Sequence, residues 1–311
     1  MYPKKIIVAT RPSKLSLVQT EIAIRWIKKT FPDIEFEIRT FKSTGDKILD
    51  KPLYMIGVKG IFEKEINQAV LRGDADIAVH SLKDLPASID PRLELACYPP
   101  RDSPYDVIVV RKCEKPSIYE LEPGSKVGTS SIRRRVFLRR IRPDIKLEDI
   151  RGNVDTRIRK LISGQYDAIV LAECGIERLR GTVPEIEEIT YSRLSVEELP
   201  PAPGQGIIVV VCRKDDHELL KMLREATHRE TTIEATCERA FLKTFGGGCH
   251  TPLGCLATCS GEEVHFQAYL ADKDTGKIYK VQISGKVTEA EQIGVRGAEE
   301  LKKIVREVEK L

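Results

Sequence analysis

Two segments of this chain share one pattern, and this repetition restricts the possible folds more than any other feature. Gly73-Asp74-Ala75-Asp76-Ile77-Ala78-Val79 resembles Gly164-Gln165-Tyr166-Asp167-Ala168-Ile169-Val170, because in both a helical stretch stops at glycine and an aspartate opens an apolar strand. A second pair, residues 8–13 and 127–132, ends a strand in small hydroxyl residues and then begins a helix. We therefore predict two similar α/β domains.

Hydrophobic periodicity assigns the elements around the first repeat. Residues 5–9, 35–41 and 76–80 have the short apolar or alternating pattern of strands, whereas residues 13–29 and 61–71 have helical spacing. This β-α-β-α-β order predicts an α/β domain with a largely parallel sheet.

A proline- and glycine-rich break at residues 199–206 separates the last third of the chain from the rest. The apolar strand that follows, residues 207–212, arrives late in the chain, and we expect it to return to the sheet of the first domain. The remaining pattern predicts one long helical stretch, a hairpin of two strands and a final amphipathic helix: residues 216–245, 264–271, 277–284 and 290–311.

The expected fold class is therefore α/β, with two similar doubly wound α/β domains and a small α+β domain at the C-terminal end. We place domain 1 at residues 1–99 and 200–222, domain 2 at 100–199 and domain 3 at 223–311.

The composition disfavours several functional classes. The 51 lysines and arginines nearly balance 47 acidic residues, whereas a nucleic-acid-binding domain usually has a larger basic excess. No apolar run approaches the ~18–20 residues of a membrane span, and the N-terminal residues lack the apolar core of a signal peptide. Cys97 and Cys212 lie in apolar runs typical of free buried thiols. We expect a reduced, cytoplasmic protein that binds neither nucleic acid nor membrane.

Arginine is concentrated in one segment, with nine arginines between Thr129 and Arg159. Guanidinium groups bind carboxylates and phosphates through paired donors, so this segment predicts a site for an anion with several negative groups. Arg133 and Arg134, near the start of the predicted helix, are expected to face the ligand. We expect the later arginines of that helix to face solvent: Arg139, Arg140 and Arg142.

Polar residues gather where the predicted strands end. Ligands of open α/β sheets bind beyond the carboxyl ends of the strands, and helix N-termini with hydroxyl groups bind anions. The residues at such positions are Arg11, Ser13, Ser81, Lys83, Asp84, Thr129, Ser130, Ser131, Arg151, Gly152 and Asn153. Each hydroxyl also fits a plain helix cap, and Asp84 also fits a turn before Pro86, so the structural interpretation stays open beside the functional one.

Three consecutive glycines, Gly246-Gly247-Gly248, precede Cys249. Glycine lets a backbone approach a ligand closely, and the thiol after it could be a nucleophile or an attachment point. A structural loop with an incidental cysteine is the alternative. A zinc site from Cys249, His250, Cys255 and Cys259 lacks paired C-x-x-C spacing, so we predict no metal.

Seven strings in order along the chain resemble the porphobilinogen deaminase (hydroxymethylbilane synthase) family of tetrapyrrole biosynthesis. They are Ala9-Thr10-Arg11-Pro12-Ser13, Gly57-Val58-Lys59-Gly60-Ile61-Phe62, Asp76-Ile77-Ala78-Val79-His80-Ser81-Leu82-Lys83-Asp84, Val127-Gly128-Thr129-Ser130-Ser131-Ile132-Arg133-Arg134, Arg151-Gly152-Asn153-Val154, Pro203-Gly204-Gln205-Gly206 and Gly247-Gly248-Cys249. The resemblance implies a fold like that of two-domain solute-binding proteins with a small third domain.

The resemblance also implies a reaction. Such a transferase joins four porphobilinogen molecules head to tail, releases four ammonias and frees hydroxymethylbilane by hydrolysis. It implies a monomer with a dipyrromethane cofactor, attached through a thioether to Cys249. Asp84, with Lys83 beside it, would be the catalytic carboxylate and would stabilise the azafulvene cation left when ammonia departs.

Carboxylate groups of the substrate and cofactor would need many donors. By resemblance these would be Arg11, Ser13, Ser81, Lys83, Thr129, Ser130, Ser131, Arg133, Arg134, Arg151, Gly152, Arg157, Arg178 and Gln205. Residues 43–59 have little periodicity and are expected to form a mobile lid, with Lys59 at its end and Phe62 placed to stack on a pyrrole.

Two other classes of protein remain as alternatives. A non-catalytic carboxylate-binding module of the two-domain solute-binding type would share the α/β domains but would need neither Cys249 nor Asp84. A nucleic-acid binder would use the arginine helix against phosphates. Turnover of porphobilinogen separates the enzyme from both.

Overall fold

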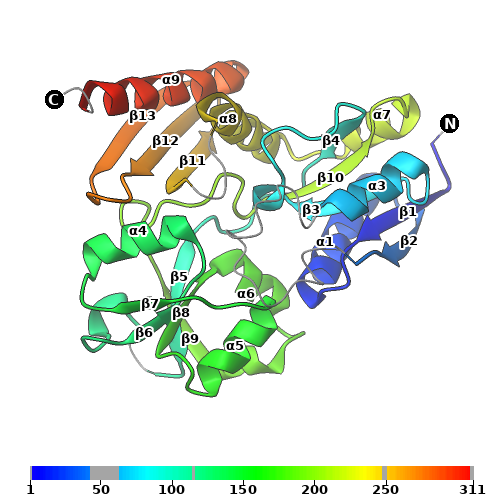
Figure 1. Cartoon of the computed structure of the whole chain (residues 1–311). Coiled ribbons are helices and arrows are strands. Elements are labelled where there is room, and N and C mark those ends of the chain that lie inside the picture. The colour runs from blue at the N-terminus through cyan, green and yellow to red at the C-terminus, as the bar shows by residue number, and fades with distance from the viewer. Residues whose placement is uncertain (1, 43–62, 114–115, 247–250, 309–311) are drawn as a thin grey trace. The chain divides into compact units, whose positions relative to one another are not determined.

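The computed structural model describes residues 2–42, 63–113, 116–246 and 251–308 of the 311-residue chain (Figure 1). The described residues form two compact units. The first unit contains the residues up to Asp102 together with Gly206–Thr232, and the second contains Ser103–Gln205 together with the residues from Ile233 onward.

The first unit is built on a five-stranded sheet with the order β2-β1-β3-β10-β4. β1 is parallel to β2 and β3, whereas β10 is antiparallel to β3 and β4. The bounds are β1 (Lys5–Thr10), β2 (Glu35–Thr40), β3 (Ile77–Ser81), β4 (Leu93–Cys97) and β10 (Ile208–Arg213). The late strand therefore returns to the first sheet, as the sequence predicts.

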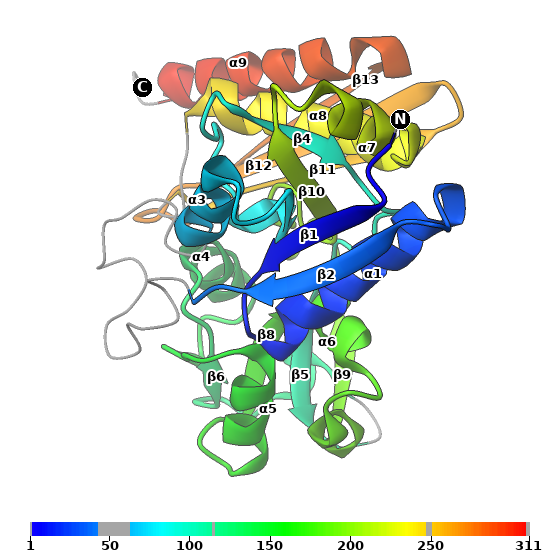
Figure 2. The ribbon, with the colours of Figure 1, turned by 90° about the vertical axis from the view of Figure 1, so that its right-hand side faces the viewer.

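Three helices accompany this sheet: α1 (Lys14–Thr30), α3 (Lys64–Arg72) and α7 (His217–Glu225). Figure 2 shows α1 running beside β1 and β2. Ile27 of α1 and Leu223 of α7 are fully buried in one apolar cluster with strand residues such as Val8 and Val210. Burial of aliphatic side chains on both sides of the sheet explains why β10 is a nearly continuous apolar run and why β3 begins with three apolar residues.

The second unit contains a five-stranded sheet with the order β7-β6-β8-β5-β9. Its strands are β5 (Asp106–Arg111), β6 (Lys126–Gly128), β7 (Lys146–Glu148), β8 (Ala168–Ala172) and β9 (Ile189–Arg193), and its helices are α4 (Ile132–Ile141), α5 (Val154–Ile162) and α6 (Glu173–Leu179). β6 is parallel to β7 and β8, and β5 is antiparallel to β8 and β9. The two five-stranded sheets confirm the predicted pair of α/β folds.

The repeated sequence pattern forms the same contact in both sheets. Asp76 accepts the backbone N–H of Ile7 at 2.7 Å, and Asp167 accepts that of Lys126 at 2.8 Å. Each aspartate thus joins the start of its own strand to the parallel neighbour. The glycine three residues before each aspartate, at position 73 or 164, has a positive φ of 81° or 79° and ends its helix.

The second unit also contains a three-stranded antiparallel sheet with the order β11-β12-β13. The predicted hairpin is confirmed as β12 (Glu263–Ala271) and β13 (Ile278–Lys286), but β11 (Leu253–Ser260) is an additional strand. Two helices, α8 (Arg229–Phe245) and α9 (Ala290–Val308), pack on it through Phe241 and Ile293, which are fully buried. The connecting 3-10 turns of the chain are η2 (Leu82–Asp84), η3 (Ile118–Glu120), η4 (Pro184–Glu188) and η5 (Val287–Glu289).

The prediction of one continuous helical stretch over residues 216–245 is wrong. The helix stops at Glu225 and a new one begins at Arg229, because distant groups bind the backbone between them. The carbonyl of Ala226 accepts Trp26 Nε1–H at 2.6 Å, and the N–H of His228 donates to the Tyr98 carbonyl at 2.8 Å.

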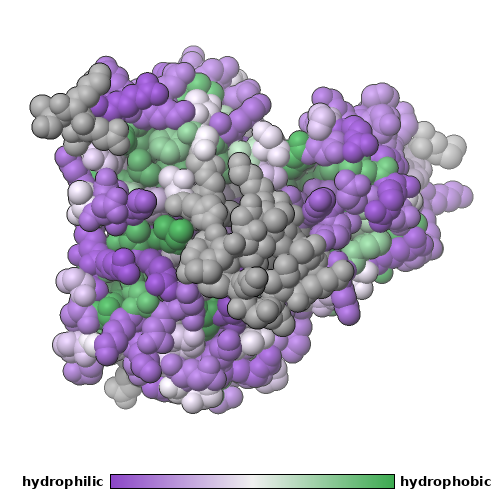
Figure 3. All heavy atoms as spheres, in the orientation of Figure 1, coloured by the Kyte–Doolittle hydropathy of each residue, from purple (hydrophilic) through white to green (hydrophobic). Residues whose placement is uncertain are grey.

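Hydrophilic side chains cover most of the described surface on the face shown in Figure 3. Within the described ranges, Ile38 and Tyr119 are the exposed large apolar side chains. None of the described helices combines the length and apolar character that a membrane crossing requires.

Candidate functional site

Polar residues of the first unit meet at the carboxyl ends of two neighbouring strands. Arg11 directly follows β1, and Ser81 is the last residue of β3. The two strands are parallel, with Ala9 opposite Ala78, so their ends lie at the same edge of the sheet. Lys83 and Asp84 continue from β3 in the 3-10 turn η2.

Hydroxyl groups at this edge already have partners. Ser13 caps α1, because its Oγ accepts the N–H of Ser16 at 3.2 Å. Ser81 Oγ accepts a hydrogen bond from Gln19 Nε2 at 2.8 Å, which joins α1 to the end of β3. Gln19 is 4% exposed and was not predicted, because nothing in a helical pattern distinguishes one inward-facing glutamine.

Asp84 differs from these hydroxyls. It is exposed, and within the described part of the chain its carboxylate has no hydrogen-bond or ion-pair partner. Lys83 beside it is half-buried. The described structure thus holds a carboxylate at the end of β3 that can accept hydrogen bonds from a ligand.

His80 lies four residues before Asp84 and is neutral. Burial lowers the pKa of its imidazole, the nearby charge of Arg11 contributes to the same shift, and the pKa is about 3 as a result. Its Nε2 lies 2.9 Å from Oδ1 of Asn67 on α3, so the ring donates this proton to the amide oxygen. The imidazole therefore connects β3 to α3.

The second unit has a matching edge after β6. Thr129 is 1% exposed, and its Oγ1 accepts the N–H of Ser131 at 3.3 Å. Ser130 Oγ donates to the Ile150 carbonyl at 2.9 Å and accepts the N–H of the same residue at 3.0 Å. Ser131 caps α4 by accepting the N–H of Arg134. These hydroxyls fix the loops that follow β6 and β7.

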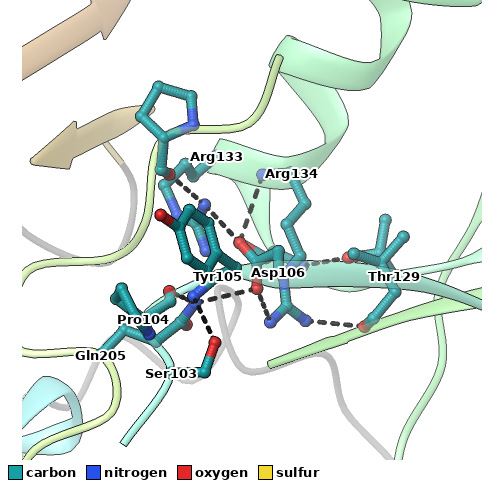
Figure 4. A network of polar contacts seen from close by, with 11 residues as sticks. Ser103, Pro104, Tyr105, Asp106, Thr129, Arg133, Arg134 and Gln205 are labelled. Carbon is teal, nitrogen blue, oxygen red and sulfur yellow. Dashed lines mark hydrogen bonds and ion pairs between the residues drawn. The ribbon is translucent and has the colours of Figure 1, made fainter. Parts of the chain in front are cut away.

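Arg133 and Arg134 form a buried ionic cluster with Asp106, the first residue of β5 (Figure 4). Arg133 Nη1 lies 2.7 Å from Asp106 Oδ2, and Arg134 Nη2 lies 2.6 Å from Oδ1. Gln205 Nε2 donates to Oδ1 at 3.1 Å and to the Pro104 carbonyl at 2.6 Å. Asp106 is missing from the residues that the sequence predicts, although it is what both arginines contact.

Backbone carbonyls complete the arginine contacts. Arg134 Nη1 donates to the Val170 carbonyl at 2.8 Å, and Arg133 Nη1 donates to the Pro200 carbonyl. Burial lowers the pKa of Arg133, and the charge of Asp106 opposes this shift. A guanidinium nevertheless remains charged in proteins. Two cations thus share one carboxylate, and the cluster has a positive excess.

The remaining arginines of α4, and Arg142 directly after it, differ in exposure and in what they contact. Arg135 contacts Asp149 at 2.9 Å and the carbonyls of Thr129 and Leu147. Arg139 and Arg140 are exposed, as predicted. The prediction that Arg142 faces solvent is wrong. Its side chain is only 12% exposed, because its guanidinium donates to the Ile118 and Leu121 carbonyls as well as pairing with Asp144.

Arg151 lies in the loop between β7 and α5, and part of its guanidinium group lacks hydrogen-bond partners in the described structure. Its Nε and Nη2 are buried and have no hydrogen-bond partner in the described structure. Burial lowers the pKa of Arg151, and Asp149 opposes that shift. Lys160 Nζ donates to the Arg151 carbonyl at 3.1 Å, and Arg157 Nε donates to the Gly152 carbonyl at 2.8 Å. Three cations therefore converge on one short loop.

Gly152 permits this arrangement. Its φ is +109°, and a Cβ at this position would lie 2.7 Å from Thr156 Cγ2. Asn153 then precedes α5 at the cap position, so the predicted helix start is confirmed. Arg178 is half-buried near the end of α6. Lys59, Phe62, Cys249 and the predicted lid of residues 43–59 lie outside the described residues.

Two protein-family models together match nearly the whole chain. A family model described as "Porphobilinogen deaminase, dipyromethane cofactor binding domain" matches residues 6–221, and one described as "Porphobilinogen deaminase, C-terminal domain" matches residues 232–303.

Individual relatives carry the same name. A probable porphobilinogen deaminase of Hyperthermus butylicus is 49% identical over 96% of this chain and 97% of its own length, and one of Pyrobaculum calidifontis is 48% identical over 96% and 98%. A porphobilinogen deaminase of Lysinibacillus sphaericus is 43% identical over 94% and 91%. Among solved structures, the Bordetella pertussis BvgS VFT2 domain is 17% identical, with a TM-score of 0.44, over 72% of this chain and 86% of that one.

Proposed function

Because this chain belongs to the porphobilinogen deaminase family, we propose that it joins four porphobilinogen molecules head to tail, with loss of ammonia, and releases hydroxymethylbilane by hydrolysis. The observation that carries the assignment of catalytic residues is Asp84, an exposed carboxylate without a described partner, placed after Ser81 at the end of β3. Lys83 lies beside it, and Arg11 lies at the same edge of the sheet.

Asp84 has a specific task in this reaction. Departure of ammonia from the aminomethyl arm leaves a substrate cation, and a carboxylate close to that cation lowers the energy of its formation. Because its oxygens have no described partner, Asp84 can also accept hydrogen bonds from pyrrole N–H groups without breaking existing ones.

The residues present fit a polycarboxylate cofactor such as a dipyrromethane. Arg151 has two buried guanidinium nitrogens without a partner, and the Asp106 cluster has more guanidinium groups than carboxylates. Buried cations of this kind are stabilised when a carboxylate reaches them. The residues proposed to bind carboxylates are Arg11, Ser13, Ser81, Lys83, Thr129, Ser130, Ser131, Arg133, Arg134, Arg151, Gly152, Arg157, Arg178 and Gln205.

When bound, the dipyrromethane would supply the pyrrole carbon to which the first substrate unit is joined. The protein's own residues hold carboxylates, orient the substrate arm toward Asp84 and exclude water until release. Gly152 and Ser130 contribute by fixing the loop that presents Arg151 and Arg157.

Cys249 is the proposed attachment thiol. A thiol must be accessible and ionisable to form a thioether, and five of the seven described cysteines are buried. Burial raises the pKa of Cys97 and of Cys212 to about 12, which makes them unreactive. Of the described cysteines, Cys113 and Cys259 remain accessible, and they serve as controls.

Intact mass under denaturing conditions tests the attachment. We expect the wild-type protein, after incubation with porphobilinogen, to gain the mass of two pyrrole units. Cys249→Ser should gain none, whereas Cys259→Ser and Cys113→Ser should gain the same mass as wild type. A mass gain that survives in Cys249→Ser and disappears in Cys259→Ser would move the attachment to Cys259.

Turnover tests the catalytic role. Asp84→Asn should retain the covalent mass gain and lower the rate of porphobilinogen consumption by about 100-fold or more, because a neutral amide cannot stabilise a cation as a carboxylate does. Undiminished turnover would remove Asp84 from the mechanism.

We expect a monomer that works in the cytoplasm. The buried free thiols among the described cysteines are typical of a reducing compartment. Light scattering after size exclusion would determine the oligomeric state.

A further inference from the structure

Arg193 is a cation of the second unit that none of the roles above explains. It is the last residue of β9, and its side chain is 60% exposed. Its Nε lies 2.9 Å and 2.7 Å from the two carboxylate oxygens of Glu173. Within the described part of the chain, its Nη1 and Nη2 have no hydrogen-bond partner. One part of the guanidinium group is thus bound, and its two terminal nitrogens can donate to a ligand.

The end of β9 lies at the edge of the sheet where the loops after β6 and β8 begin. β8 and β9 are both antiparallel to β5, so they run in the same direction, and β6 is parallel to β8. Arg193 is opposite Val107, the second residue of β5. The N–H of Leu194 donates to the Asp106 carbonyl at 3.0 Å. Arg193 therefore lies at the same edge as Thr129 and the Asp106 cluster.

Glu173, which binds Arg193, is itself held in place. It directly follows β8 and is 5% exposed. Ser103 Oγ donates to its carboxylate, and its backbone N–H donates to the Tyr105 carbonyl at 3.0 Å. Ser103 and Tyr105 belong to the loop that leads into Asp106 (Figure 4). A nearly buried carboxylate with these partners restricts the guanidinium that it binds.

The ring of Tyr105 supports the guanidinium group from a second direction. Arg193 Cζ lies 5.3 Å from the centroid of this ring, within the range of a cation–π contact. Arg180, another exposed arginine of this unit, differs because its partner Glu177 has a side chain that is 43% exposed. Arg193 is therefore the better ordered of the two, and a preordered side chain loses less conformational entropy when it binds a ligand.

The available donors of Arg193 suit one kind of ligand. The Nη1 and Nη2 groups of a guanidinium can donate two parallel hydrogen bonds to a carboxylate. The charge at this edge of the sheet also favours an anion. Arg193 and Glu173 neutralise each other, whereas the Asp106 cluster contains two guanidinium groups and one carboxylate.

We propose that Arg193 is a further carboxylate-binding residue for the pyrrole chain, and that Glu173 is a positioning residue that holds its guanidinium group in place. The inference rests on the proposed function, because the pyrrole units supply the acetate and propionate groups. Neither residue belongs to the seven strings that resemble the family, so this site adds to the carboxylate-binding residues proposed above.

Steady-state kinetics of the cofactor-loaded enzyme test the binding role. Arg193→Gln should raise KM for porphobilinogen by about tenfold, because a charged donor pair is lost, while kcat falls by less than about threefold. The double variant Glu173→Gln/Arg193→Gln leaves no buried carboxylate without its cation and should have the same KM as Arg193→Gln. The matched control Arg180→Gln removes an exposed arginine paired with Glu177 and should keep the wild-type KM. A wild-type KM in both Arg193 variants, or a loss in kcat as large as the rise in KM, overturns the proposal.

An NMR titration tests the same site without turnover. The side-chain Nε–H resonance of Arg193 is identified by its absence from Arg193→Gln. Adipate, an unreactive dicarboxylate, should shift this resonance saturably, whereas sodium chloride at equal ionic strength should not. The absence of a saturable shift contradicts the proposed site. Absence of turnover in wild type would instead contradict the proposed function, and the adipate titration would still decide whether Arg193 binds carboxylates.

Discussion

Asp106 Oδ1 lies 2.6 Å from Arg134 Nη2 and is shared with Gln205, while its other oxygen binds Arg133. Asp106 is completely buried, and both arginines are nearly so. One carboxylate therefore neutralises only one of the two guanidinium groups that it contacts. The arginines predicted to bind the ligand are also part of the structural core of the second unit.

Asp106→Asn should destabilise the protein by about 3–5 kcal/mol, because it leaves two buried guanidinium groups without their anion. Urea unfolding at neutral pH measures the change. The control Asp74→Asn breaks an exposed pair with Arg72 and should cost less than about 1 kcal/mol. Equal losses in the two variants would show that the cluster is not structural.

Arg151→Gln should weaken binding more than stability. Its Nε and Nη2 have no described partner, so the folded protein loses little, whereas a ligand carboxylate loses a charged donor pair. We expect KM for porphobilinogen to rise, or the extent of cofactor loading to fall, by about tenfold or more. The control Arg159→Gln removes an exposed arginine paired with Glu185, and its KM and cofactor loading should stay at the wild-type values.

Gly152→Ala should destabilise the second unit more than Gly124→Ala. Both glycines have a positive φ, so each alanine adds strain of about 1 kcal/mol. Only at Gly152 would the added Cβ also overlap Thr156, because nothing lies within 4 Å of the corresponding position at Gly124. The difference between the unfolding free energies of the two variants measures the steric overlap with Thr156 apart from the backbone strain. Identical values would exclude such an overlap.

His80 should make the protein less stable in acid. Its pKa is about 3 in the folded state against 6.5 as the ordinary value, so the unfolded chain binds more protons between these values. Stability is complete above pH 6.5 and is lost progressively as the pH falls toward 3. Between pH 7.5 and 4.5, His80→Gln should lose about 2–3 kcal/mol less than wild type, as measured by urea unfolding. His265→Gln, which changes an exposed histidine, should follow wild type.

The sequence predicted the elements whose pattern is local. The glycine and aspartate of each repeat determined where β3 and β8 begin, and the long apolar run of β10 indicated a strand buried on both faces. Residues at strand ends, such as Arg11 and Arg151, could be chosen because polar groups interrupt apolar runs there.

Other features depend on contacts between distant residues. Asp106 begins an apolar run in the same way as Asp76, so nothing local shows that Asp106 contacts arginines 27 and 28 positions later. The break between α7 and α8 depends on Tyr98 and Trp26, more than 120 positions away. Glu63 lies one turn before Asn67 in an ordinary amphipathic pattern, and only tertiary packing reveals that it is buried.

The position of β10 between β3 and β4 determines the order in which the chain can fold during synthesis. All strands of the second unit's five-stranded sheet have been synthesised once the chain has reached Arg193. The first sheet lacks an inner strand, β10, until Arg213 has been synthesised. The N-terminal half must therefore wait with one edge of β3 unpaired while a later segment is made. Newly made chains that stop before residue 208 expose that edge, which is where chaperone binding or aggregation would begin.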